Sequence, residues 1–107
     1  MNKVSNREIL SEARRLIQDI GFCKGRSRYV DADGHALAYC PMGAIDAAVE
    51  RLYPNEPDNY RITLACNDVF RDANEEIVSI PNWSDDPLRT KSDVLSAFSR
   101  AISSCEE

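Results

Sequence analysis

The stretch YVDADGHALAYCPMGAIDAA, residues 29–48, decides the fold. It begins with an acidic turn, Asp-Ala-Asp-Gly, and Asp-Gly favours tight turns because both residues tolerate positive φ. Cys40-Pro41 follows, and proline suits the first position of a helix, where its missing N–H is not needed. The stretch therefore predicts a short β-hairpin near residues 28–38, or an ordered loop. A helix rich in small residues follows it and ends before Pro54.

Three further helices are expected on either side of this stretch. Apolar residues recur at helical spacing over residues 6–20, and Gly21 is placed to end that helix. A third helix is expected over about residues 60–72. A last helix should begin after Thr90, which has Asp93 three residues later at the spacing of a capping box.

The apolar run at residues 77–83 contains Pro81 and is expected to form a short strand or an irregular segment across the core. Trp83, the only tryptophan, is expected to belong to the core, whereas an exposed Trp83 would be a candidate partner contact. A chain of 107 residues forms one domain. The expected architecture is therefore a single, mainly α domain, residues 1–107, with about four helices.

Composition and charge exclude several classes of protein. The chain is 43% hydrophobic and 29% charged, as in soluble globular domains. Its net charge of −5, with one small basic cluster at residues 24–28, argues against direct nucleic-acid binding. No apolar run approaches the roughly 18 residues of a membrane span, and no signal peptide is recognisable. We therefore expect a cytoplasmic protein with no membrane partner.

Cys40 is the first candidate for chemistry. A helix N-terminus can lower the pKa of a thiol, and His35 could serve as its base. However, the chain has one histidine, no cysteine-enzyme signature surrounds Cys40, and cysteine is commonly buried. The sequence therefore predicts no catalytic residue. The four cysteines are expected to be reduced, since no C-x-x-C spacing occurs among them: Cys23, Cys40, Cys66 and Cys105.

Metal sites are disfavoured by spacing. A calcium loop starting at Asp31 needs glycine at its sixth position and glutamate at its twelfth, where Ala36 and Met42 stand. Zinc would need Cys23, Cys40, the single histidine and a fourth ligand at spacings foreign to compact zinc motifs. We expect no metal and no cofactor.

Three motifs together resemble a known family. They are Cys-Pro-Met-Gly-Ala at 40–44, Trp-Ser-Asp at 83–85 and Thr-Lys-Ser-Asp-Val-Leu at 90–95. They resemble a family of small bacterial and phage proteins classed as a domain of unknown function, over about residues 7–102. The family usually has asparagine where this chain has Ser84.

The resemblance implies a small, mainly helical, intracellular protein that is often encoded by phages or other mobile elements, with no established activity. It also suggests that the helix start at Cys40 and the turn at Trp83 are two halves of one structural joint. In that joint Gly43 and Ala44 would let the Trp83 segment pack closely on the helix.

The leading functional prediction is a non-enzymatic interaction protein that binds and inhibits a host protein complex through an acidic face. A small acidic protein is suited to masking a basic, nucleic-acid-binding surface, for example on a CRISPR effector or another defence nuclease. The predicted contacts are the acidic residues of the middle of the chain: Asp46, Glu50, Glu56, Asp58, Asp68, Asp72, Glu75 and Glu76.

The alternative is a small-ligand or nucleotide-binding protein, or a minor enzyme, in which a helix N-terminus and Arg89 hold an anion. Its pocket would lie between the helix start and the following turn, lined by Cys40, Gly43, Trp83, Asp85 and Arg89. The adjacent Asp85 and Asp86 are typical of turn chemistry rather than of an acid–base pair. A transcriptional regulator is disfavoured, since no recognition helix is recognisable.

Overall fold

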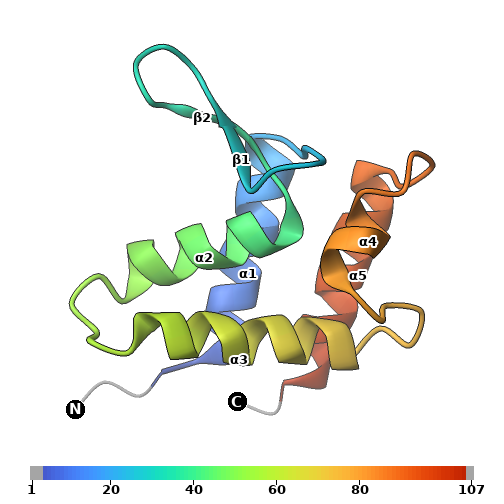
Figure 1. Ribbon diagram of the computed structural model, residues 1–107. Helices are drawn as coiled ribbons and strands as arrows, with labels where there is room; N and C mark the ends of the chain where they lie inside the picture. The colour runs from blue at the N-terminus through green and yellow to red at the C-terminus, as the bar shows by residue number, and fades with distance from the viewer. Residues whose placement is uncertain (1–3, 106–107) are drawn as a thin grey trace.

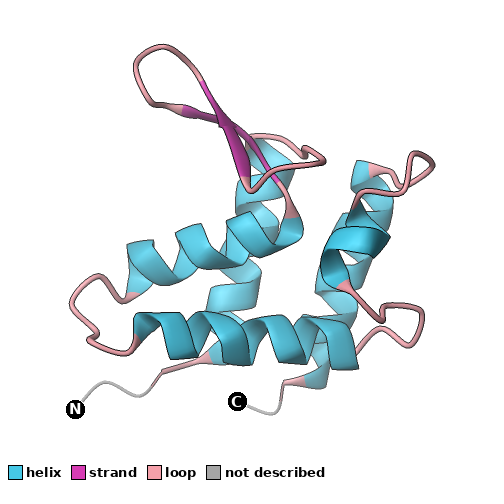
Figure 2. Ribbon diagram, viewed as in Figure 1, coloured by secondary structure: helices cyan, strands magenta, loops and turns pink. Residues whose placement is uncertain are grey.

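The computed structural model describes residues 4–105, in which five helices and one β-hairpin follow one another along the chain (Figures 1 and 2). They are α1 (Asn6–Asp19), β1 (Arg28–Val30), β2 (Ala36–Tyr39), α2 (Pro41–Leu52), α3 (Asn59–Asp72), α4 (Ile80–Ser84) and α5 (Lys91–Ser104). The predicted fold class, mainly α with a short hairpin, is confirmed. Over this range none of the helices has the length and hydropathy needed to cross a bilayer.

The long helices begin and end close to where the sequence predicts, and at the start of α1, α2 and α5 a side chain accepts a hydrogen bond from a terminal N–H group. The Ser5 hydroxyl accepts a hydrogen bond from the Glu8 N–H at 3.1 Å, and Gly21, with φ of +153°, follows α1. At α5 the capping box is complete. The Thr90 hydroxyl accepts from the Asp93 N–H at 3.1 Å, and the Asp93 carboxylate accepts from the Thr90 N–H at 3.0 Å. Hydrogen bonding from the Thr90 N–H, and then from the Thr90 side chain, lowers the pKa of the Asp93 carboxyl.

Helix α4 replaces the short strand or irregular segment expected at the apolar run around Pro81. Ile80 and Trp83, both buried, are three residues apart and so share one face of this helix, and Ile77 is buried just before it. The Ser79 hydroxyl caps the helix by accepting from the backbone N–H three residues later at 3.4 Å, and Pro81 lies in its first turn. Cap and proline together favour a helical turn over a strand here.

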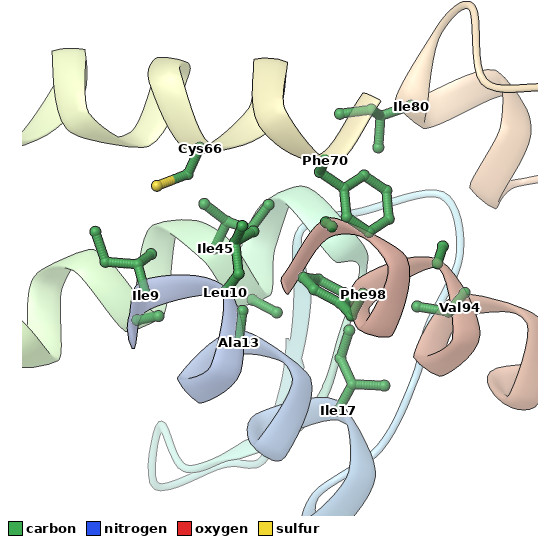
Figure 3. Packing of buried hydrophobic residues seen from close by; sticks show 14 of the residues in the cluster. Ile9, Leu10, Ala13, Ile17, Ile45, Cys66, Phe70, Ile80, Val94 and Phe98 are labelled. Atoms are coloured by element: carbon green, nitrogen blue, oxygen red, sulfur yellow. The ribbon is translucent and has the colours of Figure 1, made fainter. Parts of the chain in front are cut away.

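Helix α1 packs against α2 and α5, while α3 packs against α2 and α5, so that the helices enclose one core (Figure 1). Phe70 of α3 lies against Phe98 of α5, with ring centroids 4.6 Å apart (Figure 3). Phe70 also meets the Trp83 ring edge-on at 6.2 Å. Trp83 is only 7% exposed, which confirms that it belongs to the core.

A buried asparagine joins α3 to α5. Asn74 is 1% exposed, and its Nδ2 donates to the carbonyl oxygens of Phe70 at 2.7 Å and Ala97 at 3.1 Å. Its Oδ1 accepts a hydrogen bond from Arg100 Nε at 2.6 Å. Because each polar atom of this side chain has a partner, its burial does not leave an unsatisfied group.

The hairpin stands out from the helices in Figure 1, while its base is attached to them. Its strands pair antiparallel, with Arg28 opposite Tyr39, and Phe22 adds an isolated parallel bridge to Tyr39. In the turn, Gly34 has φ of +83°, and the Asp31 carboxylate accepts hydrogen bonds from two backbone N–H groups, both at 2.9 Å. The acidic stretch that opened the sequence analysis therefore forms the predicted hairpin turn.

Candidate functional site

The start of α2 is enclosed by the segment 21–27, defined here as the covering segment. The Tyr39 N–H donates to the Gly21 carbonyl at 2.9 Å, and the Cys23 N–H donates to the Tyr39 carbonyl at 3.0 Å. At the other end of the covering segment, the Cys40 N–H donates to the Ser27 carbonyl at 2.9 Å. These three bonds hold the covering segment against the end of β2 and the beginning of α2.

Gly43 lies where the covering segment approaches α2 most closely. A Cβ at Gly43 would overlap the Ser27 carbonyl oxygen and would lie 2.7 Å from the Ser27 carbonyl carbon. Helices α2 and α4 are in contact, as the suggested joint requires, but the backbone closest to Gly43 is that of Ser27. The suggestion that Gly43 makes room for the Trp83 segment is therefore wrong, because the covering segment occupies that space.

Cys40 is the N-cap of α2, with its Sγ accepting a hydrogen bond from the Gly43 N–H at 3.3 Å. Burial raises the pKa of the Cys40 thiol, and the Asp85 carboxylate raises it further, against the opposite effect of the backbone N–H groups at Gly43 and Met42. The lowered thiol pKa considered from the sequence is thus not found, since desolvation outweighs the helix N-terminus. His35 lies in the hairpin turn, where its Nδ1 is 3.5 Å from the Asp31 carboxylate.

Cys40 and Asp85, two of the predicted pocket residues, line one pocket of about 240 Å³ between the covering segment, α2 and α4. Gly43, Trp83 and Arg89 do not line it. Arg26, from the basic cluster at residues 24–28, and Ser84, from the Trp-Ser-Asp motif, also line it, although neither was predicted to belong to the pocket. The full lining is Gly25, Arg26, Ser27, Cys40, Met42, Ile80, Pro81, Ser84 and Asp85.

Hydrogen bonds close the pocket between the covering segment and the turn after α4. The Gly25 N–H donates to the Asp85 carboxylate at 2.9 Å, and Lys24 Nζ donates to the Asp86 carbonyl at 2.7 Å. Ser84, which is 1% exposed, places its hydroxyl 3.5 Å from the same Asp85 carboxylate oxygen. Asp85 thus holds the wall of the pocket by accepting a hydrogen bond from a distant segment. The expected turn chemistry is found at Asp86, whose carboxylate accepts from the Leu88 N–H at 2.9 Å.

Arg89 packs on the tryptophan rather than at Cys40. Its guanidinium lies 4.2 Å from the centre of the Trp83 ring, and its Nε donates to the Trp83 carbonyl at 2.9 Å. Both residues line a second hollow of about 280 Å³. If the first pocket binds an anion, Arg26 is the cation that the structure offers there.

The eight predicted acidic contacts are all at least partly exposed, but half of them form ion pairs with three arginines. The pairs are Asp46 with Arg28 at 3.7 Å, Asp68 and Asp72 with Arg71 at 3.2 and 3.6 Å, and Glu76 with Arg100 at 3.4 Å. Over residues 4–105, no ion pair within 4.0 Å involves the other four: Glu50, Glu56, Asp58 and Glu75. The acidic face is therefore a mixed surface in which these four carboxylates remain unneutralised.

One exposed group in the described residues has metal-ligand chemistry. Ligand atoms of Asp31, Asp33 and His35 lie within 4.8 Å of one another in the hairpin turn. The Asp31 carboxylate already accepts the backbone N–H groups of Asp33 and His35. The hydrogen bonds within the turn explain why these three side chains lie close together. The cluster is a different set from the zinc ligands considered from the sequence.

Comparison of the chain with curated proteins and with solved structures finds no match. A family model matches residues 1–104, which include the three motifs that carried the resemblance. This match spans nearly the whole chain, including every helix described above. The chain therefore belongs to DUF6197, a family of unknown function.

Proposed function

We propose that this chain is a non-enzymatic protein-interaction module that binds a basic surface of a partner protein. The observation that carries the proposal is a set of four carboxylates that form no ion pair within residues 4–105, on a chain of net charge −5: Glu50, Glu56, Asp58 and Glu75. A carboxylate already paired within its own chain has less electrostatic interaction to offer a partner. Unpaired ones steer and orient a basic partner.

Helix α3 places three of these carboxylates at the two ends of one surface, whereas Glu50 lies in α2. Glu56 and Asp58 lie in the loop before α3, and Glu75 lies just after it (Figure 1). The 14 residues of α3 span about 20 Å. Between the two ends, Tyr60 is 72% exposed and Leu64 is 43% exposed. These two residues are four apart and so share one face of the helix.

This surface has the composition of a protein interface, with apolar side chains at the centre and charged groups at the rim. The proposed partner is a host complex whose nucleic-acid-binding surface is basic, such as a CRISPR effector or another defence nuclease. Binding there would inhibit the complex by excluding the nucleic acid. The negative charge supports this choice of partner, and the likeness to phage-encoded proteins noted from the motifs supports the choice of a defence complex.

The test is affinity capture with the tagged full chain from a lysate of its host, at low and at moderate salt. The proposal expects one stoichiometric partner that is lost as salt rises and whose nucleic-acid binding is blocked by the purified protein. A captured partner that still binds nucleic acid in the presence of a saturating amount of the protein would contradict the proposal, as would the absence of any partner.

Charge reversal then locates the surface. The triple variant Glu56→Lys, Asp58→Lys, Glu75→Lys is expected to weaken binding tenfold or more, that is by about 1.4 kcal/mol or more. The matched control reverses three carboxylates that already form ion pairs with arginines, Asp46, Asp72 and Glu76, and is expected to weaken binding less. Both variants are first checked for native helicity by circular dichroism. Equal binding by the first variant and the unaltered protein would exclude this surface.

The pocket at Cys40 favours a second candidate, a protein that binds a small anionic ligand. Its volume of about 240 Å³ lies below the roughly 300–1,000 Å³ of drug-sized ligand sites, so a small ligand would fit. Arg26 and the N-terminus of α2 supply favourable electrostatics for an anion, whereas Asp85 opposes it.

Thermal denaturation with inorganic phosphate and with adenosine monophosphate tests this candidate. A binding site predicts a rise in Tm that saturates with concentration and that is lost in Arg26→Ala. Arg89→Ala is the matched control, because Arg89 lies outside this pocket, and it should keep the same ligand-induced rise. If neither ligand raises Tm, or if both variants respond alike, the pocket is not an anion site.

A further inference from the structure

We propose that Cys23 and Cys40 form a dithiol site that oxidises to an intramolecular disulfide. The inference rests on the geometry around the covering segment and is independent of the proposed function. None of the four cysteines, all of which lie in the described part of the chain, forms a disulfide in this structure.

The backbone places the two cysteines side by side. Phe22 and Tyr39 form a parallel bridge, with the Tyr39 N–H bonded to the Gly21 carbonyl and the Cys23 N–H bonded to the Tyr39 carbonyl. The next residues along the two segments are Cys23 and Cys40. Neighbouring strands lie about 4.8 Å apart, and we extend that spacing by one residue beyond the isolated bridge, to Cys23 and Cys40. That spacing lies within the roughly 4.4–6.8 Å between the Cα atoms of disulfide-linked cysteines.

The surroundings of the two sulfur atoms agree with this placement. Burial raises the pKa of the Cys23 thiol most, the nearby Cys40 thiol raises it further, and the Asp85 carboxylate raises the pKa of both thiols. Cys23 Sγ donates to the Arg26 carbonyl at 3.6 Å, within the covering segment. The Arg26 guanidinium acts in the opposite direction on Cys23 and lowers its pKa.

The two thiols differ in access. Cys23 is buried, whereas Cys40 is partly exposed and lines the pocket between the covering segment and α4. A small oxidant such as hydrogen peroxide can therefore reach Cys40 first. The Cys40 thiolate attacks one peroxide oxygen and becomes a sulfenic acid, with one water released after protonation. The Cys23 thiolate then attacks the Cys40 sulfur, forming the S–S bond and releasing a second water.

The proton and electron balance is complete. The two thiols lose two protons and two electrons, and one hydrogen peroxide is reduced to two water molecules. The new bond would join the covering segment covalently to the first residue of α2. Oxidation would thereby fix the wall of the pocket that Cys40 lines.

The test treats the purified, fully reduced chain with hydrogen peroxide and counts thiols after denaturation. The count should fall from four to two, and the mass of the chain should fall by about 2 Da. Trypsin cleaves at Lys24 and Arg28, between the two cysteines. A linked pair of the peptides 16–24 and 29–51 should therefore appear. A main product that joins Cys66 or Cys105, a disulfide-linked dimer, or retention of all four thiols would overturn the proposal.

Two substitutions and the pH dependence of the reaction test the same disulfide further. Cys105→Ser should still give the linked peptides, whereas Cys23→Ser should not, although its hydroxyl can replace the thiol as a donor to the Arg26 carbonyl. Because burial raises the pKa of both thiols, little thiolate exists at neutral pH. Disulfide formation should therefore accelerate by up to about tenfold for each pH unit above 7 until the thiols ionise. A rate that does not change between pH 7 and pH 9 would show that another pair of groups reacts.

Discussion

Replacement of Phe70 by alanine is expected to lower the free energy of unfolding by about 3–5 kcal/mol. Phe70 is fully buried at the point where α3, α4 and α5 meet, with the Phe98 ring 4.6 Å away and the Trp83 ring 6.2 Å away (Figure 3). Its removal loses the transfer free energy of the ring and leaves a cavity between three helices that cannot all close in. A domain is typically stable by only about 5–15 kcal/mol, so the variant would have little margin left.

Urea denaturation followed by circular dichroism measures this loss. Phe70→Leu keeps most of the volume and should cost less than about 1.5 kcal/mol. Tyr60→Ala removes an aromatic ring from the same helix at a position that is 72% exposed, so its effect should lie within about 0.5 kcal/mol of zero. A Phe70→Ala variant as stable as Tyr60→Ala would show that α4 and α5 do not pack on α3 as described.

Gly43→Ala is expected to destabilise the domain by about 3 kcal/mol, at the upper end for overpacking. The added methyl group would overlap the Ser27 carbonyl oxygen, which cannot easily move because it accepts the Cys40 N–H at 2.9 Å. The sign of the effect is informative. In a helix without such a neighbour, alanine is more favourable than glycine by about 1 kcal/mol, so the same substitution would stabilise.

Ser96→Ala is the matched control for Gly43→Ala, since Ser96 is exposed within α5 and alanine has the higher helix propensity. It should leave the urea midpoint unchanged or raise it slightly. If Gly43→Ala were stabilising as well, the covering segment could not lie against the first turn of α2. That result would also contradict the pocket and the dithiol site, because both depend on this placement of the covering segment.

Local features of the fold were predictable because they depend on residues close in sequence. Thr90 and Asp93 mark the start of α5 through two hydrogen bonds that form within one turn. The hairpin turn likewise follows from Asp31 and Gly34, whose side-chain acceptor and positive φ act within five residues. Helix α4 was missed because five residues are too few for periodicity to distinguish a helix from an irregular segment.

The candidate site was predictable only in part. Cys40 and Asp85 line the same pocket, as the sequence motifs suggested, but Arg89 packs on Trp83 instead. The cation that does line the pocket, Arg26, comes from a segment with no periodic pattern. The sequence also did not show which carboxylates form ion pairs, because Asp46 and Glu76 pair with arginines that lie 18 and 24 residues away in sequence.

By itself the sequence determined the fold class, the limits of four helices, the hairpin and the membership of a family, because capping, turn chemistry and apolar periodicity act over a few residues. Only the tertiary structure decided what lies against Gly43, what lines the pocket and which thiols are neighbours. These contacts join segments that approach one another only when the whole core packs. The free energy that places them comes from burial shared among all the helices, and no short stretch of sequence carries it.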